Sequence, residues 1–177
     1  MRRALPSEAH ALAEMHVAAW RTAYAELMPR AAIEAHTVDD RREQWTAALA
    51  DPAMGALLVE DEEGIAGFAL FGAPEEPDVD EGTGVIFGIY LLPRAIGIGV
   101  GRDLLERVTR GLVDLGYERG VLWVLEANAR ARRFYEAAGW RTDGTSSPHL
   151  VGVVDLPVVR YTRALREPRA VPAGDRS

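Results

Sequence analysis

The sequence of 177 residues contains no cysteine and no lysine, and it has no apolar run long enough to cross a membrane. The absence of cysteine excludes disulfide bonds, thiolate catalysis and cysteine-bound metals. The absence of lysine excludes Schiff-base catalysis and a P-loop for nucleotides, because that loop requires a lysine. The N-terminal segment meets acidic residues too early for a signal peptide. We therefore expect a cytoplasmic protein that makes no membrane contact.

Acidic residues outnumber basic ones, with 27 Asp and Glu against 20 arginines, and the formal net charge is −7. This balance argues against a nucleic-acid partner, which requires a basic face, and mildly favours a small cationic or amine partner. The length suggests one domain with a sizeable core. We expect this domain to span residues 1–166, followed by a disordered Pro- and Arg-rich tail at 167–177.

Apolar periodicity and turn residues predict an α/β (α+β) chain. Helices are expected from Pro6–Ser7, with Ser7 as N-cap, to about Tyr24, then over 30–50 with a break near Thr37, over 101–115 and over 128–138. Strands are expected at 2–5, 56–60, 65–72, 85–92, 121–125, 140–142 and 156–165. Turn residues throughout 143–148 predict a loop. The hairpins imply antiparallel pairing and the strand–helix–strand steps imply parallel pairing, so the sheet is mixed.

Three glycines, Gly97, Gly99 and Gly101, stand at every second position between a buried apolar strand and an amphipathic helix. Glycine allows backbone to approach a ligand without a Cβ. The first turn of the following helix offers unpaired N–H groups at the positive end of the helix dipole. This order of elements predicts an anion site, most often for phosphate or pyrophosphate.

A dinucleotide site and a purely structural turn are the other interpretations of this loop. The dinucleotide pattern G-x-G-x-x-G requires a third small residue where this sequence has Arg102 or Leu104. Glu118, about 20 residues further on, agrees with that pattern. A turn without a ligand would be a costly use of three glycines, because glycine loses much conformational freedom on folding.

Two motifs resemble the GNAT superfamily of N-acetyltransferases. The segment PRAIGIGVGRDLL resembles the acyl-CoA signature (Q/R)-x-x-G-x-(G/A), which falls on Ile96–Gly101 with Ile96 in place of Gln or Arg. A register two residues earlier would place Arg94 first. The segment Asn128–Trp140 resembles N-x-x-A-x-x-F-Y-x-x-x-G-F, with Trp140 as the last residue. The N-terminal AAWRTAYAELMP resembles a bacterial subgroup of the same family.

The resemblance implies a GNAT fold, with a mixed, mostly antiparallel central sheet and helices on both faces. It also implies that acetyl-CoA is the co-substrate, that no metal takes part, and that an acetyl group moves to a primary amine by direct attack. The strand would pair with the pantetheine arm, the glycine loop would hold the pyrophosphate, and the second motif would lie near the thioester. The implied CoA-binding residues are Tyr90, Leu91, Leu92, Ile96, Gly97, Ile98, Gly99, Val100, Gly101, Arg102, Asn128 and Tyr135.

Catalytic roles follow from the same resemblance. Tyr135 is expected to protonate the departing thiolate, and Asn128 to form a hydrogen bond near the pantetheine; an apolar stripe around Tyr135 also permits a core role. Relatives often carry a glutamate on the central strand, where this sequence has none. His149 is the preferred candidate for the general base because histidine titrates in the required range. Other candidates are Glu60, Asp80 and Glu81.

Aromatic residues are candidates for the wall of the acceptor site: Trp20, Tyr24, Phe87 and Trp123. Trp20 and Tyr24 are i, i+4 neighbours on one helix, and the alternative interpretation is that they are core or rim aromatics. The acceptor is a small-molecule or peptide amine, and family members often form homodimers. A CoA-binding regulatory module without turnover is the alternative function, favoured by Ile96 and by the missing glutamate.

Overall fold

The computed structural model describes residues 1–74, 79–80, 82–151 and 154–166; the expected tail at 167–177 and Glu81 lie outside this part. The helices are α1 (Ala9–Tyr24), α2 (Arg30–Glu34), α3 (Val38–Ala50), α4 (Val100–Asp114) and α5 (Ala129–Ala137), with short 3-10 turns η1 (Pro6–Glu8) and η2 (Pro93–Ala95). The strands are β1 (Arg2–Arg3), β2 (Met54–Asp61), β3 (Gly64–Gly72), β4 (Thr83–Leu91), β5 (Arg119–Leu125), β6 (Arg141–Val151) and β7 (Val154–Ala164).

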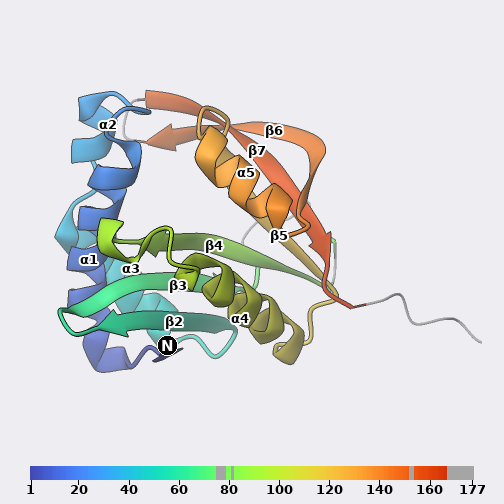
Figure 1. Cartoon of the computed structure of the whole chain (residues 1–177), viewed down its shortest axis with the longest axis horizontal. Coiled ribbons are helices and arrows are strands. Elements are labelled where there is room, and N and C mark those ends of the chain that lie inside the picture. Colours follow the sequence, from blue (N-terminus) through green and yellow to red (C-terminus); the bar gives the residue numbers. More distant parts are fainter. Residues whose placement is uncertain (75–78, 81, 152–153, 167–177) are drawn as a thin grey trace, which may run out of the picture.

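The described strands form one seven-stranded sheet in the order β1-β2-β3-β4-β5-β7-β6 (Figure 1). Within this part of the chain, β4 with β5 is the one parallel pair, and all other neighbours are antiparallel. Helices α4 and α5 cover one face, while α1 and α3 pack on the other. The expected mixed, mostly antiparallel sheet with helices on both faces is therefore confirmed.

Amphipathic helix α4 shows how the sequence pattern builds the core. Leu104, Leu105, Val108 and Leu112 recur at helical spacing, and all four are at most 1% exposed. They pack on the inner residues of β3, β4 and β5. The helix begins directly after the glycine loop, so its packing fixes the position of that loop against the C-terminal end of β4.

Two local expectations were wrong. The turn-rich segment 143–148 is part of strand β6, whose register against β7 is interrupted between Thr142 and Ser146. As an edge strand, β6 pairs on one side only, so it accepts Gly144 and Pro148. Ser7 is not the cap of α1: residues 6–8 form a 3-10 turn, in which the Glu8 carboxylate accepts from the Leu5 amide at 2.7 Å.

Candidate active site

The glycine loop has the geometry of a backbone anion site. Gly97 and Gly99 have φ angles of +86° and +89°, a conformation that residues with a Cβ rarely adopt. Gly101 is required for a different reason, because a Cβ there would stand 3.3 Å from Leu91 and 3.6 Å from Phe134. Two of the glycines therefore shape the loop, and the third lets α4 approach β4 and α5 closely.

Five successive amides, from Gly97 to Gly101, have no hydrogen-bond acceptor among the described residues. The next two, of Arg102 and Asp103, both donate to the Gly99 carbonyl, at 3.1 and 3.2 Å. Helix α4 thus presents its free N-terminal donors and the positive end of its dipole next to the loop. Ile98 at the loop tip is 70% exposed. This arrangement suits an anion such as the pyrophosphate that the sequence predicts.

The two arginines near the loop differ in their availability. Arg94 donates to the Asp61 carboxylate at 2.7 Å and to the Ile65 carbonyl at 3.3 Å, so it is directed to the β2–β3 hairpin. The Arg102 side chain is 76% exposed and stands 3.8 Å from Glu106. Arg102 is therefore the nearby cation that can turn toward a bound anion, which agrees with the register that starts at Ile96.

Strands β4 and β5 separate beside this loop. Their paired positions run from Thr83–Arg119 to Ile86–Leu122, and β4 then continues to Leu91 along β3 alone. The register of β4 against β3 shifts at Phe87, as in a β-bulge. The Leu92 amide donates to Ala66 of β3 at 2.8 Å. Because amides alternate in direction along a strand, the Leu91 amide points to the opening instead.

Helix α5 brings the second motif to the same opening. Asn128 caps the helix, with its side-chain oxygen accepting from the Ala131 amide at 3.0 Å. Tyr135 is 8% exposed, and burial raises its pKa above the usual value of 10.0, with a smaller contribution from Tyr24. Phe134 reaches Gly101 of α4. The two motifs, about 30 residues apart in sequence, thus meet across the gap between β4 and β5.

The predicted aromatic wall residues fall into two groups. The rings of Trp20 and Tyr24 are in contact at a tilt of 54°, with centroids 4.4 Å apart, and each ring centroid lies 6.4 Å from that of Tyr90. Phe87 is 39% exposed at the bulge of β4, and Trp123 lies 5.7 Å from the guanidinium of Arg160. The first group lies where α1 meets β4; Tyr90, predicted as a pantetheine neighbour through its backbone, turns its side chain to this group.

Two of the candidate bases, Glu60 and Asp80, form ion pairs with arginines. Glu60 is bound to Arg2 at 2.7 Å, and Asp80 to Arg119 at 3.1 Å. His149 stands in β6 opposite Leu156, and its side chain is outside the described part, as is Glu81. Neither Glu60 nor Asp80 is thereby brought to the opening between β4 and β5.

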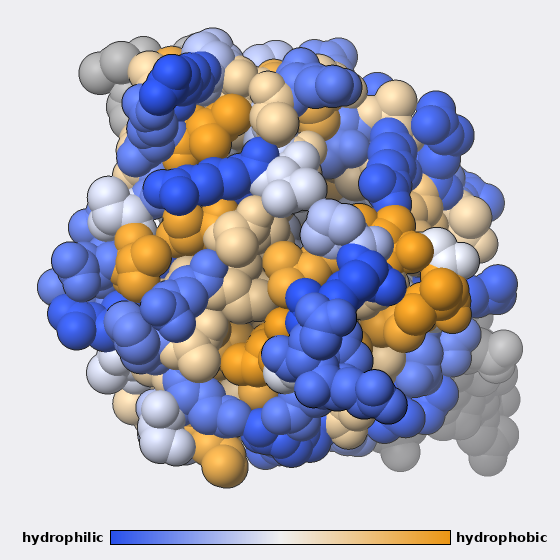
Figure 2. Space-filling view, turned by 60° about the vertical axis from the view of Figure 1, so that its left-hand side comes forward, coloured by the Kyte–Doolittle hydropathy of each residue, from blue (hydrophilic) through white to orange (hydrophobic). Residues whose placement is uncertain are grey.

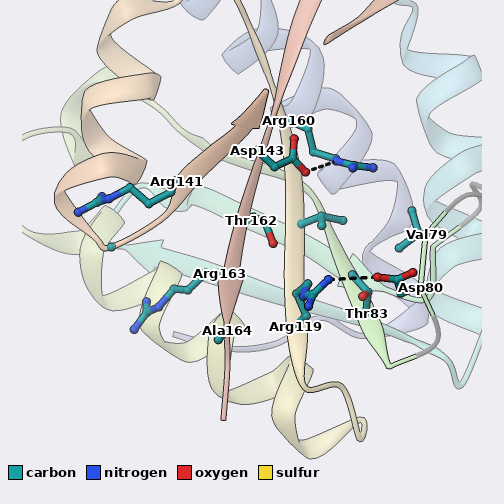
Figure 3. A pocket seen from close by; sticks show the side chains of 12 residues that line it. Val79, Asp80, Thr83, Arg119, Arg141, Asp143, Arg160, Thr162, Arg163 and Ala164 are labelled. Carbon is teal, nitrogen blue, oxygen red and sulfur yellow. Dashed lines mark hydrogen bonds and ion pairs between the residues drawn. The ribbon is translucent and has the colours of Figure 1, made fainter. Parts of the chain in front are cut away.

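A depression of about 590 Å³ lies on the face of β5, β6 and β7, at the end where β4 and β5 are paired (Figure 3). Two ion pairs border it: Arg160 with Asp143 at 2.7 Å, and Arg119 with Asp80 at 3.1 Å. Among the predicted site residues whose side chains are described, Asp80 alone lines this depression. Two of its arginines are already paired with carboxylates, so we do not assign it to the cofactor.

Three residues that lie against the group of Trp20, Tyr24 and Tyr90 were not predicted from the sequence. These residues are His16, His36 and Arg41. His16 precedes Trp20 and Tyr24 at intervals of four, so its spacing on α1 was the available signal. Its ring lies 4.9 Å from that of Tyr90, and the His36 ring lies 3.9 Å from Trp20. Arg41 stands over Trp20 at 5.9 Å. Their association depends on how α3 packs against α1, which no local pattern encodes.

Burial dominates the electrostatics of this group. It lowers the pKa of His16 from 6.5 to about 3, with smaller contributions from Arg41 and His36. It raises the pKa of Tyr24 and, further, that of Tyr90, and these two hydroxyls influence each other. At neutral pH the group therefore holds a neutral imidazole and two protonated phenols.

Comparison with known proteins agrees with both motifs. The model of the acetyltransferase (GNAT) family matches residues 11–140. An uncharacterised N-acetyltransferase, YuaI of Bacillus subtilis, is 31% identical over 127 residues, which are 71% of this chain and 70% of that protein. The chain therefore belongs to the GNAT family of acetyltransferases.

Solved structures show the same fold at lower identity. A putative acetyltransferase, yncA of Salmonella typhimurium, solved with acetyl-CoA, aligns with a TM-score of 0.72 at 21% identity, over 97% of this chain and 96% of that one. The PaiA N-acetyltransferase of Thermoplasma acidophilum, in complex with coenzyme A, aligns with a TM-score of 0.71 at 16% identity, over 92% and 96%.

Membrane-spanning helices and metal-binding clusters are both absent from the described residues. No helix in this part of the chain is both long and apolar enough to span a membrane. No group of three or more His, Asp or Glu side chains among the same residues is arranged to hold a metal ion.

Proposed function

We propose that the chain transfers an acetyl group from acetyl-CoA to a primary amine by direct attack of the amine on the thioester. The observation that carries the proposal is the opening between β4 and β5. The free amides of the glycine loop lie at this opening, and the buried Tyr135 of α5 lies across it. A pyrophosphate on the loop amides would leave the pantetheine arm to follow the unpaired edge of β4.

Each step of the transfer has a candidate group. The neutral amine nitrogen attacks the thioester carbon, and the Leu91 amide stabilises the negative charge that forms on the carbonyl oxygen. Such a donor contributes about 3–4 kcal/mol in other enzymes. The C–S bond then breaks, the nitrogen loses one proton, and the thiolate takes one from Tyr135. Because its pKa is raised, Tyr135 holds that proton at neutral pH.

His149 is proposed as the group that takes the amine proton. The support is its place in β6 next to the end of the hairpin with β7, and the titration range of histidine. In the variant His149→Ala, the pH dependence of the rate should follow only the titration of the acceptor amine. An unaltered profile would remove His149 from this role.

Tyr135→Phe tests the mechanism. We expect thiol release from acetyl-CoA to fall by about 100-fold or more, the usual range for losing a general acid, while CoA affinity changes little. Tyr117→Phe is the matched control, since Tyr117 lies beyond the far end of α4 and should have no effect. Equal rates in wild type and Tyr135→Phe would exclude Tyr135 as the acid.

The second candidate function is a CoA-binding module without turnover, favoured by Ile96 in the signature and by the lack of an acid on β4. A panel of amines assayed for thiol release separates the two functions. The enzyme releases thiol with at least one amine in the panel. A binding module would bind CoA in titration calorimetry and release thiol with none.

A further inference from the structure

Arg41 lies at helical spacing within the row of α3 residues that pack against the rest of the protein. Val38, Trp45 and Leu49 stand at helical spacing from it, and all three pack with α1, β2 and β3. Trp45 is only 2% exposed. An apolar side chain at position 41 would continue this row of packing residues. The charge of Arg41 is therefore not explained by the packing of α3.

The guanidinium of Arg41 has few partners. Its Nη1 donates to the Gln44 side-chain oxygen at 2.6 Å, and its carbon lies 5.9 Å from the Trp20 ring centroid. No ion pair joins it to a carboxylate of the described residues, and Asp40 acts on it from a longer distance. Burial is the largest influence on the pKa of Arg41 and lowers it, whereas Tyr90 and Asp40 raise it without cancelling the effect of burial. A half-buried charge in this state is costly, which indicates that an anionic partner is absent from the free protein.

On the α1 and β4 side of Arg41, three nearby aromatic side chains carry hydrogen-bond donors. Trp20 is 6% exposed, and its buried Nε1 has no acceptor in the described part of the chain. The hydroxyls of Tyr24 and Tyr90 stay protonated at neutral pH because burial raises their pKa. The two hydroxyls hydrogen-bond to each other, so one phenol proton is left; this proton, the indole N–H and the guanidinium are donors that a carboxylate can accept from. The unpartnered Trp20 Nε1 is a second observation, besides Arg41, that favours an anionic ligand.

A depression of about 330 Å³ gives access to Arg41 from solvent, lined also by His36, Asp40, Glu43 and Gln44. The Asp40 carboxylate is turned to the start of α3, where it accepts from the Thr37 hydroxyl at 2.6 Å. Figure 2 shows the side of α1 and α2, with apolar side chains gathered across the middle of this face and hydrophilic ones around them. A ligand with one anionic end and an uncharged body matches this surface.

We propose that the acceptor amine carries a carboxylate, which Arg41 binds at the α1–α3 side of the opening while the amine reaches the thioester. The inference rests on the proposed acetyl transfer and adds the substrate class: amino acids or peptides whose carboxylate stands apart from the reacting nitrogen. Arg41 provides the planar fork that carboxylates bind in two places. Trp20 and Tyr90 form the apolar wall beside it.

The test is a panel of acceptors assayed by thiol release from acetyl-CoA. It contains α-, β-, γ- and longer ω-amino acids, each beside its amide and its decarboxylated amine. Wild type should use carboxylate acceptors at least about tenfold better than the matched amides, judged by kcat/KM. Arg41→Gln should lose about 10- to 100-fold on the carboxylates and change little on the amides, since it removes a charged hydrogen bond. Arg42→Gln, an exposed neighbour paired with Asp39, is the control and should keep the preference.

The outcomes separate the two proposals. Thiol release with amides equal to acids, or an Arg41→Gln variant that keeps the preference, would overturn the carboxylate site and leave acetyl transfer standing. Absence of thiol release with every amine would overturn acetyl transfer and this inference with it. Arg41→Met adds a readout for folding: its melting temperature should equal or exceed that of wild type, because an apolar residue replaces an unpaired half-buried charge. A fall in melting temperature would show that Arg41 supports the fold instead of a ligand.

Discussion

The side-chain oxygen of Asn128 accepts a hydrogen bond from the backbone amide of Ala131 at 3.0 Å. The first residue of the second GNAT motif is therefore also the N-cap of α5. Loss of this side chain would affect CoA binding through the position of α5 even if Asn128 never touched the cofactor. Variants of Asn128 that still cap α5 are therefore needed to separate its role in stability from its role in CoA binding.

Asn128→Ala should lower the free energy of unfolding by about 1 kcal/mol, because a helix N-cap is lost. Asn128→Asp retains an acceptor for the Ala131 amide and should keep stability close to wild type. Chemical denaturation checks both values, with Thr37→Ala at the cap of α3 as a second lost cap. Calorimetry with CoA then shows whether Asn128→Asp binds normally; if it does, the amide group makes no essential contact with the cofactor.

Gly99→Ala and Gly116→Ala form a matched pair at the two ends of α4. Their φ angles are +89° and +99°, and a Cβ at either position would meet nothing within 4 Å. Each substitution should cost about 1–2 kcal/mol of stability, since left-handed backbone is strained for alanine. Only Gly99→Ala should also weaken CoA binding, measured by calorimetry. Equal CoA affinities in both variants would contradict the assignment of the glycine loop to the pyrophosphate.

The Tyr161 hydroxyl links α5 to β7. It donates to the Glu136 carboxylate at 2.7 Å and accepts from Arg132 at 3.1 Å, while Tyr161 itself is fully buried. Tyr161→Phe should reduce stability by about 1–2 kcal/mol, because the buried hydrogen bonds are lost without a change in shape. Tyr117→Phe, at a hydroxyl that forms no hydrogen bond with any described residue, should remain within about 0.5 kcal/mol of wild type. Urea unfolding of both variants provides the measurement.

His16 should make stability depend on pH. Its pKa is about 3 in the folded chain against 6.5 as the ordinary value, mainly through burial. The unfolded chain therefore binds more protons between these two values, so stability is complete above pH 6.5 and falls as the pH decreases. The loss between pH 6.5 and 5 amounts to about 2 kcal/mol.

The apolar variant His16→Met should remove this component of the pH dependence, and His10→Gln should retain it, because His10 is exposed on the outer side of α1. Unfolding curves of wild type and both variants at pH 7.5 and 5 give the comparison. The same loss of stability in wild type and His16→Met would show that His16 is not responsible.

The sequence predicts the elements whose signal is local. Helix α4 follows from four leucine and valine positions at helical spacing, and the central strand from its continuous apolar run. Asp143, Gly144 and Pro148 favour turns, which is why the sequence predicts a loop over 143–148. Pairing with β7 outweighs that local preference, and an edge strand tolerates the proline.

The candidate site is predictable only where it is contiguous. The glycine loop and the Asn128–Tyr135 helix each lie within one segment, so the sequence motifs alone indicate them. Arg41 joins Trp20 through the packing of α3 on α1, and these residues are about 20 positions apart without a shared pattern. The direction of the Tyr90 side chain depends on the register shift at Phe87, which the apolar run does not encode.

The short parallel contact between β4 and β5 has a mechanical consequence. Four paired positions connect two sets of strands within the sheet, β1 to β4 and β5 to β7. A molecule bound in the gap between β4 and β5 contacts both sets of strands and so adds a second set of contacts that holds them together. Its binding free energy then adds to their association, so loading the cofactor should slow amide hydrogen exchange in β5 and β7, beyond any contact with the loop itself.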